Sequence, residues 1–288
     1  MTYSGIVEGL SSELYNVSKA MRSTVLKKLH DATPGHLRYS LDNPSFETTE
    51  ALLRGQVLHC MVLEPHNLQK QFVLERNELK DKTKLNKNGG SKEDWDQLKS
   101  MAEVLGVPLV RHDMYLQVKG MANSISKHPH WQLFNAVGRK ELSLFAEIEG
   151  VPCKARYDVM ASDEGQTFIC DLKTSKETLT NQKVEKIIVQ YGYHFSAAMY
   201  VEIGKALGIQ IDEFSWMFVE SKAPYGCRMV KASAEMMEIG REEFYKCLRK
   251  YKECGDKNKW PMYPLTLDTI DLPGWYANKQ FLFEDPES

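Results

Sequence analysis

Residues 156–175 read RYDVMASDEGQTFICDLKTS, and they place two acids and a lysine in what otherwise looks like a buried hairpin. The polar run ASDEGQ is typical of a turn between two strands. Because side chains alternate along a strand, Asp171 and Lys173 should share one face while Leu172 takes the other. The hairpin can bring Asp158, near the end of the first strand, beside that pair. The stretch therefore predicts a polar cluster on two neighbouring strands.

The chemistry of this cluster favours a metal. Two carboxylates within a few ångströms repel each other unless a cation lies between them. Mg²⁺ takes one or two carboxylates, keeps waters and binds phosphate, and a lysine beside it can hold the attacking water. The alternative is structural: Asp158 caps a turn, and Asp171 and Lys173 form a surface ion pair. A bare Asp-x-Lys favours that alternative, whereas the upstream Asp158, the hairpin and the apolar flanks favour the metal.

The bulk composition is that of a soluble globular protein. The chain has 288 residues, 42% hydrophobic and 26% charged, which suits one large domain or two small ones. It has no apolar run of membrane-spanning length and no signal-peptide pattern at its start. The six cysteines form no CxxC pair and no zinc spacing, so we expect reduced thiols and a cytoplasmic location. The formal charge of -2 leaves nucleic-acid binding to a local basic surface.

Hydrophobic periodicity predicts helices around a block of strands, and hence a mixed α/β fold with a central β-sheet flanked by helices. Helices are predicted over 11–30, 47–63, 92–105, 112–127, 181–207 and 233–254. Strands are predicted over 141–148, 151–159, 167–174, 213–220 and near 226–231. Thr48 or Thr49 should cap the second helix, and Gly255 should stop the last one.

We expect residues 1–288 to form one domain, because no repeat and no linker-like stretch divides the sequence. Its N-terminal segment, about 1–65, should be helical. The stretch of about 256–288 contains several prolines and aromatic residues, and it should pack as an irregular arm.

The order of an Asp, a spacer and Asp-x-Lys resembles the signature of PD-(D/E)xK nucleases, with Tyr157 where proline is usual. Five further stretches resemble, in the same order, motifs of the exodeoxyribonuclease VIII family, the RecE-type phage recombination exonucleases. They are GQVLHCMVLEP (55–65), NKNGGSKEDW (86–95), CKARYD (153–158), YGYHFSAAMY (191–200) and WPMYPLTLDTIDLPGW (260–275). This resemblance spans roughly residues 10–276 and implies a PD-(D/E)xK, restriction-endonuclease-like core.

The resemblance also implies roles for single residues. Asp158 and Asp171 would be metal ligands with the Leu172 carbonyl as a third, and Lys173 would be the catalytic lysine. His59 would be a further ligand, although in an apolar helix a histidine by itself predicts a buried structural residue. The implied metal is Mg²⁺. A histidine ligand should let Mn²⁺ substitute, since Mn²⁺ accepts imidazole.

The sequence departs from related nucleases on the helix after the lysine. Those nucleases carry Gln-x-x-x-Tyr, whereas here Ser196 occupies the Gln position ahead of Tyr200. Gln190 is a poor substitute, because six residues at ~100° each would place it about 120° around one helix. Tyr193 and His194 are therefore candidate DNA contacts. The alternative is that both are core side chains of a packed helix.

Charged residues outside the motif have two interpretations each. Glu141 and Glu147 should share a strand face near the site, where either could bind or steer a metal or simply be solvated. Lys82, Lys84 and Lys87 lie in a basic, glycine-containing loop that could clamp DNA phosphates or be solvated.

Some proteins of this fold hold an iron–sulfur cluster with four cysteines, but the cysteine spacing here gives no support for one.

The resemblance implies a Mg²⁺-dependent exodeoxyribonuclease that acts on linear double-stranded DNA. It would digest the 5′-ended strand and leave 3′ overhangs for a single-strand annealing protein. Such a protein would be phage- or prophage-encoded, act in the host cytoplasm and form a homo-oligomeric ring. Two alternatives stay open: a structure-specific or restriction-type endonuclease on the same core, and a non-catalytic DNA-end-binding protein. The intact acids and lysine argue against the second.

Overall fold

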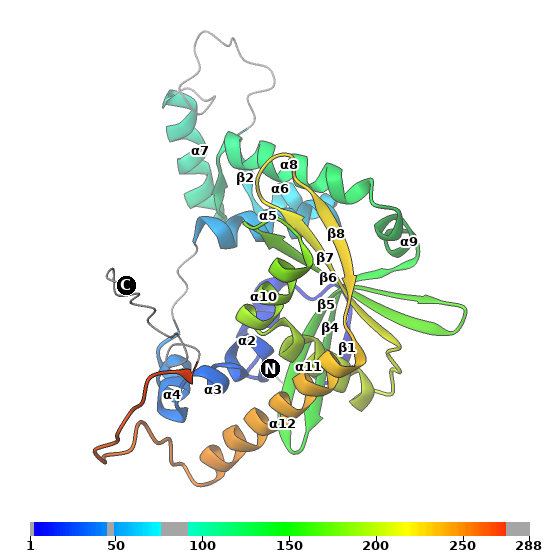
Figure 1. Ribbon diagram of the computed structural model, residues 1–288. Helices are drawn as coiled ribbons and strands as arrows, with labels where there is room; N and C mark the ends of the chain where they lie inside the picture. Colours follow the sequence, from blue (N-terminus) through cyan, green and yellow to red (C-terminus); the bar gives the residue numbers. More distant parts are fainter. Residues whose placement is uncertain (1–2, 45–48, 76–91, 275–288) are drawn as a thin grey trace, which may run out of the picture.

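The computed structural model describes residues 3–44, 49–75 and 92–274, and a six-stranded β-sheet forms its centre (Figure 1). The strand order across this sheet is β1-β4-β5-β6-β7-β8. Its strands are β1 Gly5–Val7, β4 Arg139–Ile148, β5 Val151–Asp163, β6 Gln166–Ser175, β7 Glu213–Glu220 and β8 Cys227–Lys231. A second, two-stranded parallel sheet contains β2 Val73–Leu74 and β3 Leu109–Val110.

The predicted meander is present as β4, β5 and β6, which pair antiparallel. Both connecting turns have the left-handed backbone that short hairpin loops need. Glu149 and Gly150 have φ values of 48° and 80°, and Glu164 and Gly165 have 47° and 81°. Glycine adopts this conformation at little cost, which explains the Glu-Gly sequence in each turn. Because a tight turn fixes the register, the position of these turns decides which residues face each other across each hairpin.

The rest of the sheet makes it mixed. Strand β7 runs parallel to β6 and is reached through two helices, as a parallel connection requires. Strand β8 returns antiparallel to β7, and β1 adds to the opposite edge, antiparallel to β4. The predicted mixed α/β class, with a central sheet flanked by helices, is confirmed.

Helices cover both faces of this sheet (Figure 1). They are α1 Ser12–Val17, α2 Ser23–Leu26, α3 Lys28–Asp31, α4 Pro34–Asp42, α5 Glu50–Leu63, η1 Pro65–Asn67, α6 Leu68–Gln71, α7 Lys92–Leu105, α8 His112–Ser126, α9 Pro129–Val137, α10 Asn181–Tyr191, α11 Tyr193–Ala206 and α12 Ala234–Asp256. One core lies between the sheet and α5 and α8, and it contains Leu58 and Leu172. The other lies beneath α11 and α12, where Tyr157, Phe195 and Trp216 are buried.

Three of the predicted helices are confirmed almost to the residue. The helix predicted over 47–63 is α5, and the Thr49 hydroxyl caps it by accepting a hydrogen bond from the Leu52 amide at 3.2 Å. The helices predicted over 92–105 and 112–127 are α7 and α8. For α5 the threonine at its start is the local signal that located the helix in the sequence.

The prediction of one helix over 11–30 is wrong. The segment contains three short helices, and between α1 and α2 the chain is extended at Met21. The Met21 amide donates to the Pro152 carbonyl at 2.7 Å, and the Lys154 amide donates to Met21 at 2.8 Å. Strand β5 is longer than its pairing with β6, so Met21 covers the backbone that β6 leaves open. The sheet thus overrides a local helical pattern.

Two later helices also differ from the prediction. The helix expected over 181–207 is two helices, α10 and α11, separated by Gly192 in the left-handed conformation with φ of 58°. The last helix does not stop at Gly255 but continues to Asp256. Its left-handed terminating residue is Asn258, with φ of 46°.

The N-terminal segment is not wholly helical as predicted, and the segment after α12 is irregular as predicted. Strand β1 lies within the segment that we expected to be helical. After α12, residues 257–273 contain no helix or strand, and the Gly35 amide donates to the Pro261 carbonyl at 3.0 Å.

All six cysteines carry free thiols. Among the described residues, no helix combines the length and the apolar character that a membrane crossing would require.

Candidate active site

Strands β5 and β6 separate at the point where the predicted acids lie. Their backbone pairing ends at Val159 and Cys170, next to Asp158 and Asp171. Beyond that point the Leu172 amide donates to the Asp158 carboxylate at 2.6 Å. A side chain thus bridges the two strands where the ladder ends, and it holds one Asp158 oxygen in place.

Asp171 and Lys173 lie on one face of β6, as the alternation predicts, and form an ion pair. Burial raises the pKa of the Asp171 carboxyl and the Asp158 charge adds to this, although Lys173 opposes it. Burial alone lowers the pKa of the Lys173 ammonium, but the charges of Asp171 and Asp158 together outweigh burial and raise it. Lys173 therefore stays protonated at neutral pH, so it can donate hydrogen bonds and offset negative charge but cannot act as a base.

His59 reaches the cluster from α5. Its Nε2 lies 2.9 Å from the Leu172 carbonyl oxygen, and its Nδ1 lies 3.6 Å from the Asp158 carboxylate. A carbonyl oxygen only accepts, so this contact is a hydrogen bond when Nε2 carries the proton and leaves the Nδ1 lone pair toward Asp158. Metal-binding histidines are oriented in this way. The side chain is 30% exposed, so His59 is not the buried core residue that an apolar helix suggests.

The hydrogen bond between His59 and Leu172 bears on the role of one predicted metal ligand, the Leu172 carbonyl. The Leu172 carbonyl, which the resemblance gives as a metal ligand, is the hydrogen-bond partner of His59 in this structure. It lies at the cluster and orients the imidazole.

Glu141 joins the cluster from β4, directly across from Asp158. The pairs on either side, Lys140 with Val159 and Leu142 with Tyr157, place these two carboxylates opposite each other. Glu141 itself has a φ of 50°, a left-handed conformation that is uncommon outside glycine and that interrupts the strand here. Such distortions concentrate at functional sites.

Electrostatics show how crowded these acids are. Burial first, and the neighbouring Asp158 charge second, together raise the pKa of the Glu141 carboxyl from 4.5 to about 7. His59 and Arg156 oppose the rise, and the Arg156 guanidinium lies 3.8 Å from the Glu141 carboxylate. A carboxylate with this environment gains from a cation more than from another hydrogen bond.

The donor set fits a divalent metal ion. One ligand atom each from His59, Glu141 and Asp158 lie within 4.8 Å of one another. Two carboxylates and one imidazole suit Mn²⁺ and, through the oxygens, Mg²⁺. Asp171 and Lys173 form an ion pair beside this set, so an acidic cluster and a fixed ammonium lie side by side.

The predicted contacts on the helix after the lysine separate into two groups. The Lys173 ammonium lies 5.2 Å from the centre of the Tyr193 ring, so Tyr193 is part of the site's wall. His194 is buried and its Nε2 lies 2.9 Å from Glu243 on α12, which supports its interpretation as a packed side chain. Ser196 donates to the Gly192 carbonyl at 3.3 Å, a bond within the helix turn. Burial of Tyr200 raises its pKa well above 10, with a smaller contribution from Asp171.

Other predicted residues lie elsewhere. Glu147 is exposed near the hairpin turn and does not belong to the cluster. Gln190 is exposed near the end of α10, and the break at Gly192 means that the calculation for one continuous helix does not apply to it. The basic loop residues Lys82, Lys84 and Lys87 lie outside the described residues.

Sequence reasoning underrated Glu141, which it gave only as a possible contact with the same weight as Glu147. The distinguishing signal is the hairpin register. With Glu149 and Gly150 as the turn, Ile148 pairs with Val151, and counting back along both strands places Glu141 opposite Asp158.

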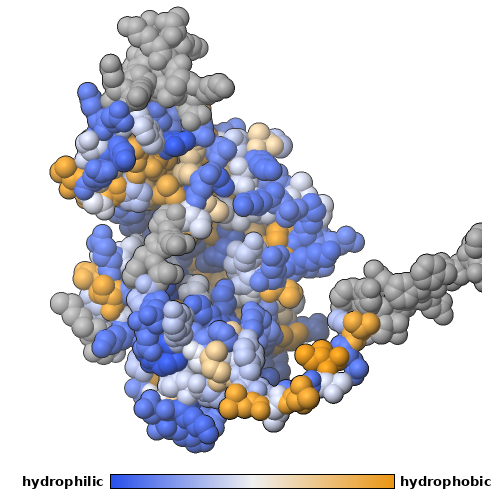
Figure 2. Space-filling view, turned by 90° about the vertical axis from the view of Figure 1, so that its left-hand side faces the viewer, coloured by the Kyte–Doolittle hydropathy of each residue, from blue (hydrophilic) through white to orange (hydrophobic). Residues whose placement is uncertain are grey.

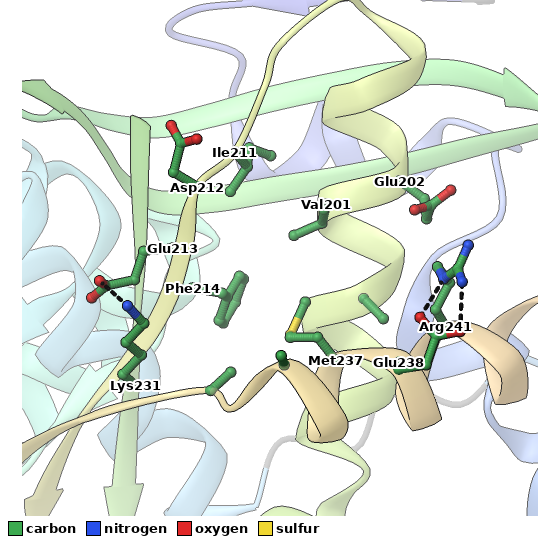
Figure 3. A pocket seen from close by; sticks show the side chains of 13 residues that line it. Val201, Glu202, Ile211, Asp212, Glu213, Phe214, Lys231, Met237, Glu238 and Arg241 are labelled. Carbon is green, nitrogen blue, oxygen red and sulfur yellow. Dashed lines mark hydrogen bonds and ion pairs between the residues drawn. The ribbon is translucent and has the colours of Figure 1, made fainter. Parts of the chain in front are cut away.

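A separate cavity of about 480 Å³ lies between α11, β7 and the start of α12 (Figure 3). Val201, Phe214 and Met237 form an apolar part of its lining, while Glu213 pairs with Lys231 at 2.7 Å on its rim. The residues that line it include none of the metal cluster, so this cavity is distinct from the candidate active site.

Comparison with known proteins identifies the family and the fold of this chain. Residues 23–272 match the family described as a PDDEXK-like domain of unknown function, DUF3799. None of the curated proteins matches the sequence. Among solved structures, a protein named "Putative exonuclease" from Eubacterium rectale aligns over 90% of this chain and 97% of its own, with a TM-score of 0.58 and 15% identity. The protein SSO0001 aligns over 68% of this chain and 86% of its own, with a TM-score of 0.28 and 11% identity.

Proposed function

The chain belongs to the DUF3799 family of PDDEXK-like domains, and on this basis we propose that it is a divalent-metal-dependent deoxyribonuclease. The observation that carries the proposal is the cluster of His59, Glu141 and Asp158 beside the Asp171–Lys173 ion pair. A structural ion pair would need neither the extra carboxylates nor the imidazole. In metal-assisted phosphodiester hydrolysis a cation offsets charge on the phosphate, and a fixed donor beside it stabilises the charge that develops.

Each residue has a role in this proposal. His59, Glu141 and Asp158 would hold the cation, with Asp171 close enough to share in its field. A divalent cation bound there would lower the pKa of a water and neutralise charge on the phosphate. Lys173, protonated and fixed by Asp171, would orient the attacking water and donate to a phosphate oxygen as charge develops. The Leu172 carbonyl would keep the His59 proton on Nε2, so that Nδ1 is available to the metal.

We propose that the enzyme acts from DNA ends as an exonuclease. Two observations support this: the motif order that resembles RecE-type nucleases, and the shared fold with the protein named "Putative exonuclease". By the same resemblance, the product would be a 3′ overhang for a single-strand annealing protein.

One experiment tests activity, end dependence and direction together. Linear duplex DNA, labelled at one 5′ end or one 3′ end, and covalently closed circular duplex are incubated with Mg²⁺, with Mn²⁺ and with chelator. We expect digestion of the linear DNA alone, dependent on metal, with early release of the 5′ label. Cleavage of the closed circle would instead support an endonuclease, and metal-dependent digestion by Lys173→Ala at the normal rate would refute the assigned site.

The C-terminal arm, residues 261–273, supports the proposal of a homo-oligomer. Leu265, Leu267 and Ile270 are 106%, 103% and 90% exposed, and Figure 2 shows apolar groups along this segment standing away from the body. Several exposed aliphatic side chains close together in one segment form an apolar surface, and such a surface is typical of a site that another protein surface covers. A second copy of the chain would cover them in a head-to-tail contact, the kind that closes into a ring.

Light scattering after gel filtration tests this contact. Leu265, Leu267 and Ile270 are changed together to Ser, which should convert an oligomer into smaller species. The matched control changes three exposed aliphatic residues of helices α7 and α9 together to Ser: Val104, Leu133 and Val137, which are 86%, 68% and 61% exposed. An unchanged mass for the arm variant would refute the role of the arm.

A further inference from the structure

The break between α10 and α11 creates an aromatic surface beside the candidate active site. Gly192 turns the chain with a φ of 58°, so Tyr191 and Tyr193 lie on the same side of the break. Their ring centres are 5.6 Å apart and the planes differ by 22°, which is a stacked arrangement. Tyr191 is 51% exposed, so part of this stack is open to solvent. One uninterrupted helix would have directed the two rings to different faces, since they are two residues apart.

This stack is continuous with the acidic cluster. The Lys173 ammonium lies 5.2 Å from the Tyr193 ring centre and pairs with Asp171. The Tyr193 ring also lies 6.2 Å from Phe218 on β7, which supports it from the sheet. The order Asp171, Lys173, Tyr193, Tyr191 therefore leads from the predicted reaction centre out to solvent.

A second lysine lies at the outer end of this row. Lys27, between α2 and α3, donates from Nζ to the Tyr191 carbonyl oxygen at 2.6 Å. An ammonium has three donor hydrogens, so two are left for another acceptor. In the part of the chain that the structure describes, no carboxylate forms an ion pair with Lys27. Burial lowers the pKa of Lys27 and the Lys173 charge lowers it further, while the Asp31 charge opposes both, so Lys27 and Lys173 lie close enough to interact electrostatically.

We propose that Tyr191, Tyr193 and Lys27 form a nucleotide platform that binds an unpaired nucleotide of the DNA strand next to the phosphate being hydrolysed. The base would stack on the exposed ring of Tyr191, and a phosphate oxygen would accept hydrogen bonds from Lys27. The inference rests on the proposed nuclease function and deepens it, since it identifies the substrate at this point as a single strand.

The chemistry favours an unpaired nucleotide. A base inside a duplex has both faces covered by its neighbours, whereas an unpaired base offers a free face to an aromatic ring. Stacking on tyrosine tolerates every base, which suits an enzyme that digests DNA without reading sequence. The lysine contributes charge but no base-edge recognition, so it positions the strand.

A structural role for these residues makes different predictions. Lys27 could serve only to cap the C-terminal carbonyls of α10, and Tyr191 only to cover Tyr193. Substitutions would then lower thermal stability without changing DNA affinity, or would change affinity equally for every DNA. The nucleotide platform predicts a loss that depends on the bases of a single-stranded extension.

Fluorescence anisotropy of the full-length protein in chelator separates the two interpretations, because binding is then measured without cleavage. Three DNA probes are compared: a blunt duplex, the duplex with a four-nucleotide single-stranded extension, and the same extension made of abasic sites. The variants are Tyr191→Ala, Tyr191→Phe and Lys27→Gln. Tyr39→Ala on α4 and Lys205→Gln at the end of α11 are matched controls, because both side chains are exposed and neither belongs to the proposed platform.

We expect Tyr191→Ala to bind the normal extension between about fivefold and about a hundredfold more weakly, the range for losing one base–aromatic stack. The same variant should bind the abasic extension like wild type, and Tyr191→Phe should bind every probe like wild type. Lys27→Gln should weaken binding to both extensions and reduce the log–log salt slope by about 0.7.

Equal effects of Tyr191→Ala on normal and abasic extensions would overturn the nucleotide platform. So would unchanged affinity of both variants for extended DNA while wild type still digests linear duplex, a result that leaves the proposed nuclease intact. If wild type neither binds nor digests any DNA with metal, the proposed function itself fails. A cleavage assay on the same preparations thus distinguishes the two failures.

Discussion

Replacing Glu141 with Gln should stabilise the metal-free protein and at the same time weaken its response to metal. Gln has the shape of Glu but carries no charge, so Glu141→Gln removes one of two facing carboxylates and leaves the packing of β4 unchanged. Opposite effects with and without metal are characteristic of a ligand in a crowded anionic site. A residue that only supports the fold would not produce them.

The magnitude follows from the environment of the carboxyl. Its pKa rises from 4.5 to about 7 in the folded protein, first because of burial and then because of Asp158. At about 1.4 kcal/mol per pKa unit, the charged form costs the folded state about 3 kcal/mol. Because the folded pKa is the higher one, the folded state binds more protons between pH 4.5 and about pH 7, and stability falls as the pH rises through this window.

Thermal melts in chelator at pH 4.5, 6 and 8 test this sign and size. At pH 8 Glu141→Gln should melt about 5–10 °C above wild type, and near pH 4.5 the two should nearly coincide. Added Mn²⁺ should raise the melting temperature of wild type far more than that of Glu141→Gln, since a ligand stabilises only the state that binds it.

Glu147→Gln is the matched control, because Glu147 lies on the same strand but is exposed. It should shift neither the pH dependence nor the metal response. A Glu141→Gln variant that melts below wild type at pH 8, or that gains as much stability from Mn²⁺ as wild type, would refute the placement of Glu141 in the metal cluster.

Three further perturbations test the remaining parts of the site. Lys173→Ala should lower the rate of DNA digestion by at least about a hundredfold while circular dichroism shows a folded protein, and a normal rate would contradict its role at the phosphate. His59→Ala should raise the metal concentration that gives half-maximal digestion and change the metal-free melting temperature little, because the side chain is 30% exposed; a large loss of stability with an unshifted metal midpoint would instead show a structural histidine. Changing Lys82, Lys84 and Lys87 together to Gln should reduce the log–log salt slope of duplex binding by about 0.9 for each lost phosphate contact, and an unchanged slope would show that the loop does not touch DNA.

Local sequence signals were sufficient for much of the scaffold. Alternation along β6 placed Asp171 and Lys173 on one face, and the Glu-Gly turns located the hairpins that bring Asp158 near them. The threonine cap and apolar pattern located α5, and hence the helix that carries His59. These features depend on contacts between residues close in sequence, which periodicity and turn chemistry report directly.

Tertiary structure decided the rest, because the deciding contacts join distant parts of the chain. His59 meets Leu172 across 113 positions, and Lys27 meets Tyr191 across 164. The segment around Met21 became extended because the open backbone of β5 satisfied it better than a local helix could. Sequence alone thus determined the hairpin, and with it the acids and the lysine that resemble the PD-(D/E)xK signature. Only the packed sheet and helices decided that Glu141 rather than Glu147 faces Asp158. The same packing turned His194 toward α12 and stacked two tyrosines beside the lysine. The reason is that a local pattern specifies which face a side chain takes but not which residue lies opposite it.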